Sequence, residues 1–209
     1  QVGDCIVALP RVTNAQLLMI SHHALQPKRE SISAALGFAL ASGALSDVTV
    51  TTTNGREHKA HKLILALRSS VFESMFRAKM REAEYGLVLL GDFSDRVSDM
   101  FMQFLYTGDA TAAAHDISTA ELCELSALAH KYAVSDLLAS CSTLLSETLR
   151  LENAACVLRL ADGLQLAELK QVCLDYIVAN PQVMDTDEWA QDVTHCASLV
   201  TEVAEALGG

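Results

Sequence analysis

The sequence predicts an α+β fold, in which a small β-sheet is capped by α-helices and followed by an all-α region. Two short segments between residues 47 and 60 alternate apolar and polar residues around an Asn-Gly pair, which is typical of a β-hairpin. After Gly108, apolar residues recur only at helical spacing. Hydrophobic residues make up 51% of the 209 and charged residues 20%, with three prolines, so a disordered or collagen-like chain is excluded.

The first 41 residues predict a strand, a linker and a helix, in that order. Residues 4–9 alternate like a single strand that has no sheet of its own. Residues 10–30 contain two prolines and no clear period, so we interpret them as a linker. Residues 31–41 predict a short helix with one apolar stripe, made of Ile32, Leu36 and Leu40.

The hairpin is predicted from strands at 47–53 and 56–60, joined by a two-residue turn at Asn54-Gly55. Short helices are predicted at 61–67 and 70–76. The second begins with Ser70 followed by Glu73, the spacing of a capping box.

Further along the chain, residues 87–90 predict a short buried strand, and an apolar stripe from Val97 predicts a helix that ends at a Gly108 cap. Ser118 and Glu121 predict a capping box at the start of the next helix. The remaining helices are predicted near 137–145 and at 153–161, 166–178 and 189–207.

The charge pattern points toward a protein partner. A net charge of −11 argues against electrostatic binding to nucleic acid or to an anionic membrane. The basic residues gather in a band at 56–81, which we interpret as solvated loop and helix ends, followed by two acidic blocks. The longest stretches without a charged residue are 16 residues long, shorter than the roughly 20 apolar residues of a membrane span.

Six cysteines are scattered along the chain without a CxxC pair, and most of those after residue 108 fall at or beside apolar stripes. We therefore expect reduced, structural cysteines, consistent with a protein of the nucleus or the cytoplasm. The six are Cys5, Cys123, Cys141, Cys156, Cys173 and Cys196.

The common catalytic and cofactor motifs do not occur in the sequence, which holds no GxGxxG, GxxxxGK[ST], HExxH or GxSxG. His58 and His61 have no nearby Cys or His pair that would complete a zinc site. We expect instead a half-exposed His58 on a strand and a hydrogen-bonded His61 at the start of a helix. Cys123 and His130 are seven residues apart on one helix, about 10 Å by helical rise, too far for a nucleophile and its base. We expect no enzymatic activity, no cofactor and no metal site.

The run from Ser46 to Leu138 resembles the BTB/POZ domain family, whose landmarks occur here in order. One departure is His58, where the family usually has Phe. The landmarks are Ser46-Asp47-Val48, the stretch 60–66, Arg68-Ser69, Val71-Phe72, Met75-Phe76, the stretch 104–108, the stretch 129–133 and Leu137-Leu138.

The resemblance continues on both sides of this run. Residues 150–209 are similar to the BACK-type helical tail of the speckle-type POZ (MATH-BTB) family, and residues 4–9 resemble the closing strand of a MATH domain. The implied division is the end of a MATH-type domain and a linker at 1–30, a BTB/POZ domain at 31–149 and a BACK-like region at 150–209.

The resemblance implies a non-catalytic adaptor that recruits substrates to a cullin-3 RING ubiquitin ligase. A domain upstream of the BTB domain would hold the substrate protein. The cullin-binding residues implied are Met80, Arg81 and Glu82, in the loop after the second short helix. An exposed Met can enter an apolar pocket of a partner, and Glu can bind donors beside it.

The resemblance also implies a homodimer, with higher oligomers left open. The helix with Ile32, Leu36 and Leu40 would pack on the partner subunit, and Asp47 with Lys62 would form a buried charged pair in the dimer pocket. Stabilisation of the monomer alone is the other interpretation of these residues.

Two other BTB classes stay open at this stage. One is a transcriptional regulator that recruits corepressors through its dimer groove and usually carries zinc fingers downstream. The other is a channel-type tetramerisation domain, which would lack the extended helical tail. Binding to a cullin distinguishes these classes.

Overall fold

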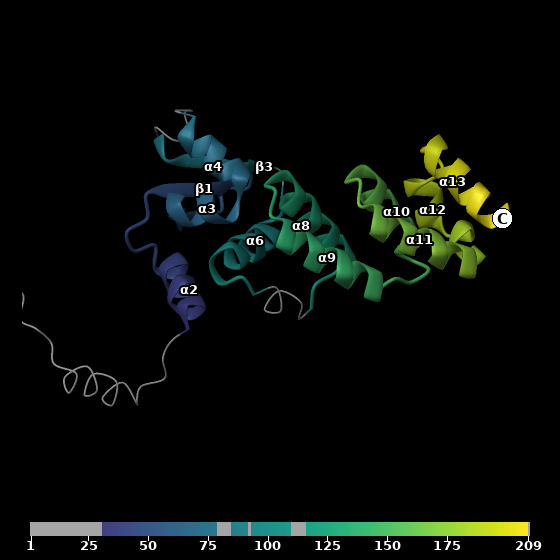
Figure 1. Ribbon diagram of the computed structural model, residues 1–209, viewed down its shortest axis with the longest axis horizontal. Coiled ribbons are helices and arrows are strands. Elements are labelled where there is room, and N and C mark those ends of the chain that lie inside the picture. Colours follow the sequence, from purple (N-terminus) through teal and green to yellow (C-terminus); the bar gives the residue numbers. More distant parts are fainter. Residues whose placement is uncertain (1–30, 79–84, 92, 110–115, 209) are drawn as a thin grey trace, which may run out of the picture.

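The computed structural model describes residues 31–78, 85–91, 93–109 and 116–208. The fold is α+β, as the sequence predicts. Figure 1 shows an elongated molecule, with a sheet and helices α2, α3 and α4 at one end, α6, α8 and α9 in the middle, and α10–α13 at the other end. The predicted strand at 4–9 and the linker at 10–30 lie outside the described residues.

Three strands form a mixed sheet in the order β2-β1-β3. The central strand β1 (Val48–Thr52) pairs antiparallel with β2 (Glu57–Ala60) and parallel with β3 (Leu87–Gly91). Valines of β1 point into the core, and β3 alternates buried with exposed residues. The expectation that β3 is a buried strand is therefore wrong, because Leu87 and Leu89 face away from the core.

The connection between β1 and β2 differs from the predicted two-residue turn. Gly55 donates its N–H to the Thr52 carbonyl, and the N–H of Thr52 bonds to the carbonyl of Arg56. Gly55 has φ +87°, whereas Asn54 has no positive φ, so a type I′ turn is excluded. The hairpin closes through a three-residue loop with its glycine in the left-handed region.

Helices α3 (Lys62–Arg68) and α4 (Ser70–Arg77) pack beside the sheet. The N-cap of α4 is Ser69, whose Oγ accepts from the Phe72 N–H at 3.2 Å. The predicted capping box from Ser70 is therefore wrong by one residue. Ser69 takes this position because its hydroxyl also donates to the buried Tyr132 carbonyl at 2.5 Å.

Two predicted helix boundaries in the middle of the molecule are confirmed. Helix α6 (Asp95–Thr107) ends at Gly108, which has φ +68° and bonds back to the Phe104 carbonyl. Helix α8 (Thr119–Lys131) begins with the reciprocal capping box of Ser118 and Glu121. Helix α9 (Ser135–Glu147) follows and buries one apolar stripe against α8.

The tail consists of helices α10 to α13 and one 3₁₀ helix. The single helix predicted at 189–207 is wrong, because the chain turns between Asp192 and Ala197. Trp189 and Leu199, on either side of this turn, are both buried in the core. The bounds are α10 (Ala154–Gly163), α11 (Ala167–Ala179), η1 (Pro181–Asp185), α12 (Asp187–Asp192) and α13 (Ala197–Gly208).

One continuous apolar core links the sheet, the central helices and the tail. Helix α11 contacts α9, so the helices of the tail continue the layer formed by the central helices. A helix with the length and apolar character needed to cross a bilayer is not found in the described part of the chain.

Candidate protein-interaction surfaces

Helix α2 (Ile32–Ser42) carries the largest uncovered apolar side chains near the start of the described chain. Ser31 Oγ accepts from the Ala34 N–H, and Gly43 caps the other end at φ +62°. Ile32 is 81% exposed and Phe38 71% exposed, whereas Leu36 and Leu40 are partly covered by the core. The predicted stripe of Ile32, Leu36 and Leu40 is therefore divided, with only Ile32 on the open side.

A single hydrogen bond shows how α2 is held. Ser33 Oγ donates to the Thr107 carbonyl at 3.0 Å, and α2 packs on α6 and β2. No side chain of α2 is buried in the single chain. A helix with Ile32 and Phe38 open to solvent is suited to contact a second molecule.

The other large exposed apolar residues lie nearby in sequence. Among the described residues, every large apolar side chain that is more than half exposed lies between residues 32 and 89. Two of them, Leu63 and Leu67, are one turn apart on α3. Besides Ile32 and Phe38, the set comprises Leu45, Leu63, Leu67, Tyr85, Leu87 and Leu89.

Asp47 and Lys62 are in contact through the side chain of Asp47 and the backbone N–H of Lys62. The Lys62 N–H, at the first position of α3, donates to Asp47 Oδ1 at 2.7 Å, so the carboxylate stabilises the start of that helix. The Lys62 ammonium lies 6.0 Å from the Phe76 ring centre. Asp47 is exposed in the single chain, and a role for the pair in a dimer pocket stays a prediction.

His61 ties the segment after α2 to the core. Its Nε2 lies 2.8 Å from the Ala44 carbonyl, and its Nδ1 lies 2.8 Å from the Tyr106 hydroxyl. The His61 backbone N–H donates to the same hydroxyl at 2.8 Å. Burial raises the pKa of Tyr106 to about 12, so the phenol stays neutral and keeps both bonds. The predicted role of His61, a hydrogen-bonded histidine at a helix start, is confirmed.

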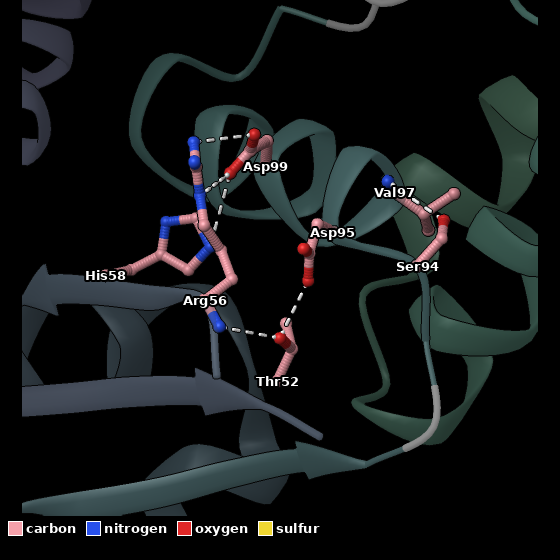
Figure 2. Close-up of polar contacts among 7 residues, drawn as sticks. All are labelled: Thr52, Arg56, His58, Ser94, Asp95, Val97 and Asp99. Carbon is pink, nitrogen blue, oxygen red and sulfur yellow. Dashed lines mark hydrogen bonds and ion pairs between the residues drawn. The ribbon is translucent and has the colours of Figure 1, made fainter. Parts of the chain in front are cut away.

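A polar cluster pins the hairpin to the first turns of α6 (Figure 2). Arg56 forms two hydrogen bonds to the Asp99 carboxylate, at 3.1 and 2.9 Å. His58 Nε2 lies 3.4 Å from Asp99 Oδ1, and Thr52 Oγ1 donates to Asp95 at 2.8 Å. The carboxylates of Asp95 and Asp99 therefore bind side chains of the hairpin.

The His58 side chain is only 9% exposed, more buried than the half-exposed position we expect from the sequence. Burial lowers the pKa of His58 despite the opposing charge of Asp99. A hollow of about 380 Å³ lies beside the ring, between the end of α2, the hairpin and α6. Positive and negative side chains both line this hollow, so its charge indicates no particular class of ligand.

Several arginines of the basic band at 56–81 form ion pairs, in addition to being exposed to solvent. Arg56 binds Asp99, Arg68 binds Asp136 at 2.8 Å, and Arg77 binds Glu73. These partners follow from the tertiary fold, except for Arg77, whose acid is four residues earlier on the same helix. The proposed cullin-binding residues Met80, Arg81 and Glu82 lie outside the described residues, between α4 and β3.

A second hollow, of about 510 Å³, lies between α9 and α11. Sequence reasoning did not find it, because it forms only where the tail packs against α9. The apolar part of its wall includes Leu138, Leu166 and Val172. No group of three or more metal-ligating side chains occurs in the part of the chain that the structure describes.

Comparison with known proteins agrees with this fold. Residues 38–149 match the BTB/POZ domain family. The chain is 36% identical over 154 residues to TD and POZ domain-containing protein 4 of Mus musculus, and 34% identical to TD and POZ domain-containing protein 1 of the same organism. Each alignment covers 73% of this chain and 41% of the relative, so the chain spans about two-fifths of these proteins' length.

Among solved structures, the chain is similar to the BTB domain of zebrafish PATZ1, with 20% identity and a TM-score of 0.47, covering 59% of this chain and 97% of that one. The family match covers more than half of the 209 residues and contains the hairpin, α3, α4, β3, α6, α8 and α9. The chain belongs to the BTB/POZ domain family.

Proposed function

We propose that this chain forms a homodimer through its BTB domain and recruits substrate proteins to a cullin-3 RING ubiquitin ligase. In this role it is a non-catalytic subunit that acts in the nucleus or the cytoplasm. A further domain of the whole protein, of the MATH type that the speckle-type POZ family carries, holds the substrate. The observation that carries the protein-binding part of the proposal is the exposed apolar surface between residues 32 and 89.

The exposed side chains of α2 support self-association. Covering one Ile or Phe side chain contributes about 1.5–3 kcal/mol, so a symmetric contact that covers Ile32 and Phe38 on both subunits yields a substantial driving force. In a twofold dimer each such residue is covered twice, once on each protomer.

The helical tail supports an adaptor over a channel-type tetramerisation domain. Helices α10 to α13 follow α9 directly and share its core, which extends the BTB unit at the end away from α2 (Figure 1). The resemblance to cullin-3 adaptors includes such a tail, whereas the channel-type domain lacks one. The segment with Met80, Arg81 and Glu82 supplies the proposed cullin contact.

The dimer is tested with a chain in which Ile32→Asp and Phe38→Asp are combined. We expect light scattering to show a dimer for the wild type and a folded monomer for the variant, because both side chains are already open in the single chain. Val200→Asp, at an exposed position of α13, is the matched control and should stay dimeric. A variant that remains a dimer refutes the proposed interface.

Cullin binding is tested by calorimetric titration with the N-terminal domain of cullin-3. Met80→Asp should weaken binding by about 2 kcal/mol or more, roughly thirtyfold, because it removes a central apolar anchor. Glu82→Ala should weaken binding less, since charges at the rim mainly tune the association rate. Val200→Asp should bind like the wild type, and thermal melts establish that each variant is folded.

Two outcomes contradict the proposal. Equal affinity of all variants for the cullin domain would show that the segment with Met80, Arg81 and Glu82 is not the contact. A wild-type chain that does not bind the cullin domain would favour the alternative, a BTB transcriptional regulator that recruits corepressors.

A further inference from the structure

Helices α8 and α10 begin side by side, although 35 residues separate their first turns in sequence. Asn153, the N-cap residue of α10, donates from Nδ2 to Thr119 Oγ1 at 3.3 Å and to the Thr148 carbonyl at 2.9 Å. Thr119 is the first residue of α8. Side chains three or four residues further along a helix lie one turn on, on the same face, so the next turn of each helix should meet there too.

Cys123 and Cys156 occupy these next-turn positions, and their thiols contact each other. In its thiol form, Cys156 also donates its S–H to the Asn153 carbonyl at 3.1 Å. Both cysteines are half-buried, so a small solute can reach them, whereas Cys141 and Cys173 are buried. The sequence conceals this pair, because 32 residues lie between the two cysteines.

The two thiols have different surroundings. The pKa of Cys156 is lowered, chiefly because the Cys123 S–H donates to its sulfur, and burial opposes this effect. The pKa of Cys123 is raised by the same hydrogen bond and by burial. Arg159, one turn after Cys156, favours the thiolate of both, although its ion pair with Asp192 at 2.8 Å offsets part of its charge. Cys156 lies in the first turn of α10, where the positive end of the helix favours a thiolate, whereas Cys123 lies in the second turn of α8. Cys156 is therefore the nucleophile and Cys123 the resolving thiol.

We propose that Cys123 and Cys156 form a redox site that reacts with hydrogen peroxide and closes to a disulfide between α8 and α10. The Cys156 thiolate attacks one peroxide oxygen, the O–O bond breaks, and the departing hydroxide takes a proton to leave as water, which gives a sulfenic acid. The Cys123 sulfur then attacks the Cys156 sulfur. The S–O bond breaks, the Cys123 proton leaves with the hydroxyl as a second water, and the peroxide has accepted two electrons.

The disulfide would join the BTB domain to the tail. Helix α8 lies inside the family match at 38–149 and α10 lies outside it. A covalent bond here closes a loop that includes all of α9 and the connection to α10, and so restricts the unfolded chain and any movement of the tail. This site is independent of the proposed cullin contact and of α2.

The test is oxidation of the chain with hydrogen peroxide in a Cys5→Ser background, followed by intact mass and non-reducing peptide mapping. We expect a loss of about 2 Da, two hydrogens, and a tryptic cross-link between peptides 97–131 and 151–159, both reversed by dithiothreitol. The oxidised chain should melt at a higher temperature than the reduced chain.

Cys123→Ser should abolish the mass loss and leave a sulfenic acid on Cys156 that dimedone traps, and Cys156→Ser should abolish both. Cys123→Ala replaces the serine variant if circular dichroism shows that the latter is unfolded. Cys196→Ser is the matched control, because Cys196 is also half-buried, and it should oxidise like the wild type. No mass loss in the wild type, or a cross-link from Cys156 to Cys173 or Cys196, would overturn the proposal.

Discussion

His58 shows how one residue can depart from its family and still fit the fold. The BTB domains that this chain resembles usually have Phe at this position, and the structure places His58 where an aromatic ring fits, 9% exposed on β2. The imidazole Nε2 faces Asp99, which Arg56 already holds by two hydrogen bonds (Figure 2). Burial therefore favours the neutral ring, and the pKa of His58 lies below its ordinary value of 6.5.

This lowered pKa predicts a dependence of stability on pH. The unfolded chain takes up a proton on His58 near pH 6.5, before the folded chain does, so protonation favours unfolding. The stability that the neutral ring supplies is present above pH 6.5 and is lost as the pH falls toward the folded pKa. We expect His58→Phe to lose less free energy of unfolding than the wild type between about pH 7.5 and 5.5.

Urea unfolding at several pH values measures this difference. His130→Phe, at an exposed position of α8, is the control and should keep the wild-type dependence on pH. If His58→Phe and the wild type lose stability in parallel, then His58 does not carry the effect.

At the scale of the element, the start of α4 depends on a contact that local rules do not contain. Ser70 with Glu73 has the spacing of a capping box, yet Ser69 caps the helix. Ser69 Oγ both accepts from the Phe72 N–H and donates to the Tyr132 carbonyl, 63 residues further on. The cap thus also connects α4 to the end of α8, where Phe72 and Tyr132 stack at 4.6 Å.

Ser69→Ala should lower the free energy of unfolding by about 1–2 kcal/mol, because a helix cap is lost and a buried carbonyl loses its donor. Ser70→Ala is the matched control on the same helix. Ser70 is exposed, so its substitution should change stability by no more than about 0.5 kcal/mol. Urea unfolding compares the two variants, and a larger loss for Ser70→Ala would show that the capping box operates instead.

At the scale of the whole molecule, the BTB unit and the tail share one core. The only tryptophan of the chain, Trp189, lies in the tail on α12, so its fluorescence reports unfolding of that end. Leu65 of α3 is fully buried at the other end. A shared core predicts that the two ends unfold together.

Leu65→Ala should therefore shift the Trp189 fluorescence transition to lower urea, since a leucine cavity costs about 2–5 kcal/mol. Leu63→Ala, two residues away and 70% exposed, should leave the transition in place. If Leu65→Ala shifts the unfolding transition measured by circular dichroism but not the one measured by Trp189 fluorescence, the tail unfolds independently.

The sequence by itself determined the α+β class, the hairpin, the Gly108 cap, the capping box of Ser118 and Glu121, and the family. These features depend on local periodicity, on the few residues that suit a cap or a turn, and on ordered landmarks. Contacts between neighbours in a helix or a hairpin follow directly from such spacing.

Only the tertiary structure decided which faces stay open and which distant residues meet. The stripe of α2 is divided because the core partly covers Leu36 and Leu40 but leaves Ile32 exposed. Periodicity within one helix does not show what packs against it. Cys123 with Cys156, and Ser69 with Tyr132, are pairs from separate helices. Such pairs form only after the helices pack, because the residue pattern of one helix does not determine how a second helix is aligned against it.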